Sequence, residues 1–186
     1  MSIKDSIKDC EEKMGKAITH MQEELKGFRT GRASPALVEN LKVDYYGSPT
    51  PLRQLASISA PQPDMLVIKP YDASAIPAIE KAIKTSELSL APITEGKMVR
   101  LNLPPLSEER RRQLVNQAKH VGEQAKISIR NIRRDVIKDL ERQEKEKLIT
   151  EDDLDHGKKQ VEDLTKKYIE KVDTLVAQKS REIMEG

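Results

Sequence analysis

The fold is decided by one stretch, residues 110–134, which reads RRRQLVNQAKHVGEQAKISIRNIRR. At about 100° per residue along a helix, its apolar and basic side chains fall on opposite sides. The apolar side holds Leu114, Ala118, Val121, Ala125 and Ile132. The basic side holds Arg112, Lys119, Lys126, Arg130, Arg133 and Arg134, within about a third of the circumference. We call these six basic residues the cation row. The pattern predicts one long helix that packs by its apolar face.

The cation row has few acidic neighbours on its own helix. Residues 110–134 carry eight basic side chains and a single acidic one, Glu123, so ion pairs three or four residues apart are scarce. A solvated face with internal ion pairs is the alternative interpretation, but unpaired cations repel one another and favour an external anion. Arginine outnumbers lysine, which suits bidentate phosphate contacts. The row therefore predicts a nucleic-acid-binding surface. Because no aromatic residue lies along it, we expect backbone and shape recognition of folded RNA.

Composition narrows the class of protein. Charged residues make up 34% of the chain and aromatic residues 3%, which favours long solvated helices over a thick core. The net charge of +2 hides a segregation, because residues 135–155 carry nine acidic and four basic side chains. A single cysteine, Cys10, excludes an intramolecular disulfide and a cysteine-based zinc site. No apolar run approaches the ~18 residues of a membrane span, and the first residues resemble no targeting peptide. We expect a soluble cytoplasmic protein that does not bind a membrane.

Two further segments show the pattern of an amphipathic helix. In residues 3–28 the apolar positions are Ile3, Ile7, Cys10, Met14, Ala17, Met21, Leu25 and Phe28. In residues 150–183, which open on Thr150 and three acidic residues, they are Val161, Leu164, Tyr168, Val172, Leu175, Val176 and Ile183. The middle helix is expected to begin after Ser107 and to reach about Leu148. No helix of the three can bury its stripe alone, so we predict a three-helix bundle of residues 1–30 plus 106–186.

Residues 31–105 are predicted to form a small inserted α/β domain. Strands are expected at residues 43–46, 65–68 and 99–103, a short helix over 76–83 opened by Ser74, another short helix at Ser34-Pro35 and a poorly patterned strand over 52–59. The predicted fold class is therefore α+β. It consists of an elongated three-helix bundle, discontinuous in sequence, with an inserted small α/β domain.

The two connections between these parts predict a hinge. One contains Thr30 and Gly31 and the other contains Pro104-Pro105. Two short connections side by side allow a change of angle, because few contacts need cross between the parts. Arg29 and Arg32 add positive charge at the first connection, where they would contact RNA or pair with glutamates of the middle helix. The alternative interpretation of Gly31 is a simple helix terminator.

No catalytic constellation is visible. The three histidines, His20, His120 and His156, lie on three different predicted helices without metal-ligand spacing. No glycine-rich phosphate loop follows a strand. Cys10 occupies an apolar position and is expected to be a core residue. We therefore predict that the chain is not an enzyme and needs neither cofactor nor metal.

Six stretches form a distinctive set: RTGRASP at 29–35, YYG at 45–47, PTPL at 49–52, LPPL at 103–106 leading into EERR at 108–111, RNIRRD at 130–135 and EDD at 151–153. Together they resemble the bacterial ribosome recycling factor family over the whole chain. RTGRASP together with RNIRRD at this separation is far more specific than a single short motif.

The resemblance implies an L-shaped monomer that enters the A site of the ribosome after termination and lies on large-subunit 23S rRNA. It implies that the factor separates the subunits together with elongation factor G and GTP. GTP hydrolysis would belong to the partner, because this chain shows no phosphate loop. The resemblance also implies RNA contacts by Arg130, Asn131, Arg133 and Arg134, hinge-proximal arginines at 29 and 32, and a hinge at Gly31 and Pro104-Pro105.

Two interpretations from other classes stay open. The chain would be a helical adaptor if its cation row met an acidic protein surface, which nuclease treatment of co-purified material distinguishes from RNA binding. An enzyme would need chemistry at a cleft between the domains. The scattered histidines argue against it, and NTPase activity of the chain alone would revive it.

Overall fold

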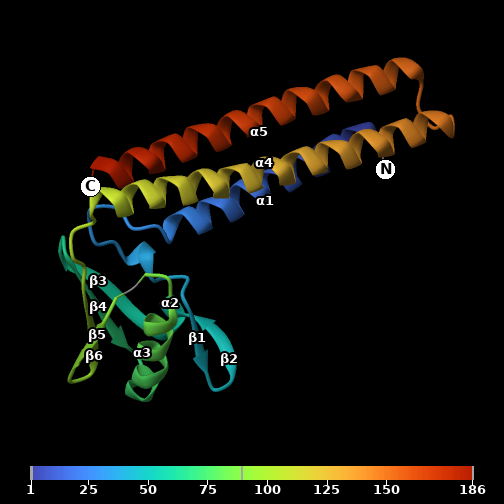
Figure 1. Cartoon of the computed structure of the whole chain (residues 1–186). Coiled ribbons are helices and arrows are strands. Elements are labelled where there is room, and N and C mark those ends of the chain that lie inside the picture. Colours follow the sequence, from blue (N-terminus) through green and yellow to red (C-terminus); the bar gives the residue numbers. More distant parts are fainter. Residues whose placement is uncertain (1, 89, 186) are drawn as a thin grey trace. The chain divides into compact units, whose positions relative to one another are not determined.

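The computed structural model describes residues 2–88 and 90–185 and contains three long helices. These helices are α1 (Ile3–Lys26), α4 (Glu108–Lys145) and α5 (Glu151–Glu185) (Figure 1). The chain divides into two compact units. The first comprises the chain up to Leu25 together with Asn116–Ser180, and the second comprises Lys26–Val115 together with the chain from Arg181.

The first unit is a bundle of α1, most of α4 and most of α5, which run along one another in Figure 1. Its buried apolar side chains come from all three helices: Cys10, Met14, Ile18, Met21, Leu25, Ala118, Ala125, Ile129, Leu140, Leu154, Val161, Tyr168 and Val172. Packing is close enough that a Cβ built on Gly122 would lie 2.6 Å from Val176 Cγ2. The predicted bundle from both ends of the chain is confirmed.

The first helix differs from its predicted pattern at its ends. Ser6 is buried near the start of α1, whereas Ile3 and Ile7 are only half-buried. The helix ends at Lys26, so Phe28 lies outside it, because Gly27 has no helix-favouring side chain. Ile18, which the predicted set omitted, is 8% exposed and belongs to the core.

Helix α4 ends at Lys145 and not at the predicted Leu148. Lys147 adopts a left-handed backbone with φ 59°. The Leu148 N–H donates to the Gln143 carbonyl at 2.9 Å, and the Lys147 N–H donates to the Glu144 carbonyl at 2.9 Å. This pair of bonds is a Schellman motif, which satisfies the last carbonyls of a helix and turns the chain away.

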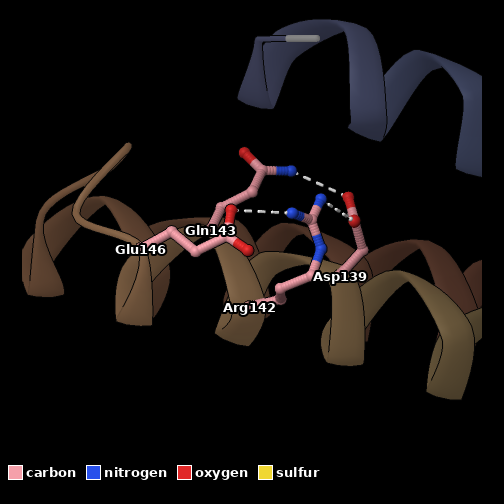
Figure 2. A network of polar contacts seen from close by, with 4 residues as sticks. All are labelled: Asp139, Arg142, Gln143 and Glu146. Atoms are coloured by element: carbon pink, nitrogen blue, oxygen red, sulfur yellow. Dashed lines mark hydrogen bonds and ion pairs between the residues drawn. The ribbon is translucent and has the colours of Figure 1, made fainter.

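A polar network surrounds Arg142 near the same helix end, as Figure 2 shows. Arg142 donates through Nη2 to Asp139 Oδ1 at 2.7 Å and through Nη1 to Glu146 Oε2 at 2.9 Å. Gln143, which is 5% exposed, donates from Nε2 to Asp139 Oδ2 at 2.7 Å. These bonds, the one from Arg142 first, hold the pKa of Asp139 below its ordinary value. Asp139 therefore stays ionised and joins two donors of one helical turn.

Asp139→Asn is expected to lower the free energy of unfolding more at pH 7 than at pH 3. Because the folded-state pKa of Asp139 is lowered, its stabilisation is present above the unfolded pKa of about 3.9 and disappears as pH falls through the folded-state pKa. Urea unfolding at both pH values measures this. Asp163→Asn, at an exposed carboxylate on α5, is the control. An equal loss for Asp139→Asn at pH 3 and pH 7 would contradict the ionic role.

The last helix begins as predicted. Thr150 Oγ1 accepts a hydrogen bond from the Asp153 N–H at 3.0 Å, and the Asp153 carboxylate accepts one from the Thr150 N–H at 3.1 Å. This reciprocal pair satisfies two backbone donors that a helix start would otherwise leave open. It lowers the pKa of Asp153.

Thr150→Ala is expected to lower the free energy of unfolding by about 1 kcal/mol, because the cap hydroxyl is lost. Urea denaturation followed by circular dichroism measures it. The control is Thr174→Ala, at an exposed position away from the ends of α5. This substitution should be neutral or slightly stabilising. Equal stabilities of the two variants would show that the cap contributes nothing.

The second unit contains two antiparallel sheets and a short helix. Its strands are β1 (Lys42–Tyr45), β2 (Ser48–Pro51), β3 (Ala56–Gln62), β4 (Met65–Pro70), β5 (Pro92–Glu95) and β6 (Met98–Asn102). β1 and β2 form a hairpin, and the other four are ordered β3-β4-β6-β5. The helix α3 (Ile76–Thr85) packs on this core, which includes the fully buried Leu66, Ile68, Ile79, Ile83, Val99 and Leu101.

The second unit agrees in part with its predicted elements. The strands predicted at 43–46, 65–68 and 99–103 correspond to β1, β4 and β6. The strand predicted over 52–59 was wrong at its start, since Leu52–Leu55 forms one helical turn, α2, before β3. Ser74 does not cap α3. Instead Asp72 accepts the Ser74 N–H at 3.0 Å and caps a 3-10 turn, Ala73–Ala75, that leads into the helix.

Candidate nucleic-acid interface

The packed face of α4 is rotated toward the cation row relative to the prediction. Its buried positions include Ala125, Ile129 and Leu140, whereas Val121 and Ile132 are only half-buried. At about 100° per residue this rotation brings part of the row to the edge of the bundle interface and leaves the rest toward solvent. The six cations are therefore not equivalent.

Lys126 lies at that edge and is neutralised within the bundle. Its side chain is 16% exposed and forms ion pairs with Asp173 of α5 and, at 3.4 Å, with Glu123. The bond to Asp173 raises the pKa of Lys126, and Glu123 adds to the effect. Lys126 therefore joins α4 to α5.

Arg133 and Arg112 also have acidic partners. Arg133 donates through Nε at 2.8 Å and through Nη2 at 2.7 Å to Glu162 Oε1 of α5. Arg112 Nη2 pairs with Glu108 Oε1 at 2.7 Å, one turn earlier on α4. The expectation that the row lacks partners was wrong for Arg112, Lys126 and Arg133. Their partners Glu108, Asp173 and Glu162 lie outside residues 110–134, so the pattern of that stretch does not show them.

Three cations of the row remain unpaired. Lys119, Arg130 and Arg134 are exposed and have no ion pair or hydrogen bond from their side chains within residues 2–88 and 90–185. Asn131 is exposed beside them and is likewise free to donate and accept. Arg130 and Arg134 are one turn apart, and Lys119 lies about 16 Å from Arg130 along the axis. Like charges one turn apart repel, so this face is complementary to a chain of phosphates.

Arg29 joins the two connections of the predicted hinge. Its Nη2 donates to the Pro104 carbonyl at 2.6 Å, so the two segments lie side by side as predicted. Burial, and then the nearby Arg110, lowers the pKa of Arg29. The contact is to a carbonyl and not to a glutamate of α4. Arg32, by contrast, is exposed, and so are Gly31, Pro104 and Pro105. Thr30 is half-buried, and its hydroxyl donates to the Arg32 carbonyl at 3.4 Å.

Other chemistry-bearing side chains have structural surroundings. His20 pairs with Glu24 at 2.8 Å on the exposed side of α1. Burial raises the pKa of the Cys10 thiol to about 11, as suits a core residue. Within the described ranges, no three or more histidine, cysteine or acidic residues are grouped closely enough to hold a metal ion. None of the helices described there is long and apolar enough to cross a bilayer.

The protein therefore belongs to the class of helix bundles that are discontinuous in sequence and carry a small antiparallel-sheet unit. One helix of its bundle, α4, bears unpaired cations. The sequence matches the family described as Ribosome recycling factor over residues 21–184. The ribosome-recycling factor of Thermomicrobium roseum is 48% identical over 183 residues, which cover 98% of this chain and 99% of that protein. That of Oleidesulfovibrio alaskensis is 47% identical over 177 residues, which cover 95% and 96%.

Solved structures agree with the sequence relatives. The solution structure of a ribosome recycling factor matches with a TM-score of 0.76 and 41% identity, over 100% of this chain and 99% of that one. A second match, with a TM-score of 0.66 and 39% identity over 99% and 100%, belongs to models for the T. thermophilus ribosome recycling factor and the E. coli elongation factor G bound to the E. coli post-termination complex. The chain belongs to the ribosome recycling factor family, and its role is that of a translation factor that acts on the ribosome.

Proposed function

We propose that this chain is a non-enzymatic factor that enters the A site of the post-termination ribosome and binds large-subunit 23S rRNA. Together with elongation factor G and GTP, it then splits the subunits. The observation that carries the proposal is the line of exposed, unpaired cations on α4, Lys119, Arg130 and Arg134. The related T. thermophilus factor described with elongation factor G on a post-termination complex supports it.

The RNA-binding residues divide into two groups under this proposal. Lys119, Arg130 and Arg134 contact phosphates directly, and Asn131 adds an amide that can donate and accept. Arg32 is a further exposed cation, at the first connection. The second group acts at the margin of the RNA. Arg112, Lys126 and Arg133 form ion pairs with acidic residues, so only the positive charge that these pairs leave uncompensated attracts the RNA. Arg29 keeps the two connections together.

The remaining parts of the proposal concern motion and partners. We infer that the inserted domain, residues 31–105, turns about Thr30-Gly31 and Pro104-Pro105 relative to the bundle of residues 1–30 and 106–186. Elongation factor G acts on that arrangement, and the GTP is hydrolysed by that partner. The factor works as a monomer in the cytoplasm and needs no cofactor.

Binding to purified subunits tests the RNA contact. The chain is expected to co-sediment with large subunits in preference to small ones. The logarithm of its affinity should fall with the logarithm of salt concentration with a slope of about −2 to −3, as three phosphate contacts require. Binding that stays the same between about 50 and about 200 mM salt would overturn the proposed contact with RNA phosphates. An acidic protein partner is favoured instead if binding survives nuclease digestion of the subunits.

A further inference from the structure

A groove lies between α1 and α4 in the first unit, where the two helices run along one another (Figure 1). Its volume is about 410 Å³, within the range of small-molecule pockets, about 300–1,000 Å³. Five polar side chains line it, which we call the polar lining: His20 and Glu24 of α1, and His120, Gln124 and Ser128 of α4. Buried apolar side chains, Met21 and Ala125 among them, complete the groove.

The spacing of the polar lining places it along the groove from both sides. His120, Gln124 and Ser128 are four residues apart, so they lie on one face of α4 at intervals of about 6 Å. They are exposed, and their side chains form no hydrogen bond or ion pair within the described parts of the chain. On α1, His20 Nε2 lies 2.8 Å from Glu24 Oε1. The groove therefore offers unused donors and acceptors of α4 beside a carboxylate of α1.

The groove differs in charge from the cation row on the same helix. Among the described residues that line it there is no lysine or arginine, and the one carboxylate belongs to Glu24. Gln124 and Arg130 lie about a third of the circumference of α4 apart, while Asn131 lies about two turns after Gln124 on the same side. Phosphates are therefore attracted to the cation row and not into the groove. An uncharged group that the same RNA strand carries is not repelled from it.

The chemistry of the polar lining matches the edge and the face of a nucleobase. A glutamine amide donates and accepts side by side, so Gln124 can form a bidentate pair with a base. A carboxylate accepts from an amino group, which adenine, cytosine and guanine carry and uracil lacks. Imidazole rings stack on unpaired RNA bases, and the groove has one ring on each helix, His20 and His120. This composition favours an unstacked base that carries an amino group.

We propose that the groove between α1 and α4 holds one unstacked RNA base with an amino group, while phosphates of the same RNA lie on Lys119, Arg130 and Arg134. The Gln124 amide and the Glu24 carboxylate contact the edge of the base, and an imidazole ring covers its face. The proposal rests on the proposed function, because the base belongs to large-subunit RNA. It adds a base contact to the phosphate contacts, so the chain recognises one position of the RNA and not only its backbone.

Chemical probing of large-subunit RNA tests the proposal. The full chain is bound at saturating concentration to purified large subunits, which are treated with dimethyl sulfate for adenine and cytosine, kethoxal for guanine and a carbodiimide for uracil. We expect the unmodified chain to protect an adenine, cytosine or guanine that Gln124→Ala leaves reactive. Gln160→Ala, at an exposed position on α5, is the matched control and should keep the protection.

The other outcomes of the probing experiment are distinct. If the protection that depends on Gln124 falls on a uracil, or if no protection depends on Gln124, the proposed base contact is overturned although the chain still binds. If the unmodified chain does not bind large subunits at all, the proposed function is overturned together with it.

The affinity of Gln124→Ala gives an independent readout. This variant is expected to bind large subunits about 10-fold more weakly, because a bidentate pair with a base is lost. Its salt slope should stay unchanged, since no phosphate contact is removed, and Gln160→Ala should bind like the unmodified chain. An unchanged affinity or a smaller salt slope in Gln124→Ala contradicts the base contact. Weaker binding without any change in base protection overturns it in favour of a protein side chain in the groove.

Discussion

Reversal of Arg130 and Arg134 to glutamate is expected to weaken binding to the large subunit at least ~100-fold at moderate salt. Two phosphate contacts are lost, and two anions then face the RNA backbone. Both side chains are exposed, and no acidic partner for either lies within the described parts of the chain. Helicity and the free energy of unfolding should therefore change little, by roughly 0.5 kcal/mol or less. Co-sedimentation with large subunits and urea denaturation measure the two quantities.

The double variant Lys159→Glu/Lys166→Glu is the matched control. It changes the net charge by the same amount at two exposed positions on α5, so it should bind nearly as well as the unmodified chain. Equal weakening in both double variants would mean that net charge, and not the line on α4, governs binding. Arg133 is unsuitable for this test because a glutamate there would face Glu162. Its reversal would change stability together with binding.

Ile129→Ala is expected to have the largest effect on stability, about 2–5 kcal/mol of the free energy of unfolding. The side chain is 0% exposed, so its truncation removes buried apolar contacts and leaves a cavity between the helices. Urea unfolding followed by circular dichroism measures the loss. Ile127→Ala, the same substitution two residues earlier on α4 at a position 47% exposed, is the control. It should cost less than about 1 kcal/mol.

Equal losses for Ile127→Ala and Ile129→Ala would contradict the orientation of α4 in the bundle. The cation row would then face a different direction, and the division into paired and unpaired cations would fail with it. The stability measurement thus tests the geometry on which the RNA contact depends.

The period of α4 was predictable from the sequence, but its rotation was not. The predicted apolar side included two alanines, whose small side chains locate the centre of a packed face poorly, and it omitted Ile129. The resulting offset made all six cations look alike. The partners Glu162 and Asp173 lie on another helix, so counts within α4 could not find them. A short α4–α5 turn does predict antiparallel neighbours, and that signal pointed to acidic residues on α5.

Caps and inserted strands show where local patterns carry information. Thr150 and Ser107 were predictable as caps because an acceptor precedes a periodic segment. β2 and β5 were missed because Pro49, Pro51 and Pro92 reduce strand propensity. The hydrogen bond from the Tyr45 hydroxyl to Asp72 was not predictable, since the sequence separates the two residues by 27 positions. Only the fold brings them together.

Subunit splitting tests the central claim most directly. Light scattering is recorded after post-termination ribosomes are mixed with this chain, elongation factor G and GTP. The account predicts a fall in scattering that needs all three components and that is lost in Arg130→Glu/Arg134→Glu but kept in Lys159→Glu/Lys166→Glu. No fall with the folded, unmodified chain and an active elongation factor would contradict the proposed function. An equal fall with Arg130→Glu/Arg134→Glu would contradict the assignment of the RNA contact to α4.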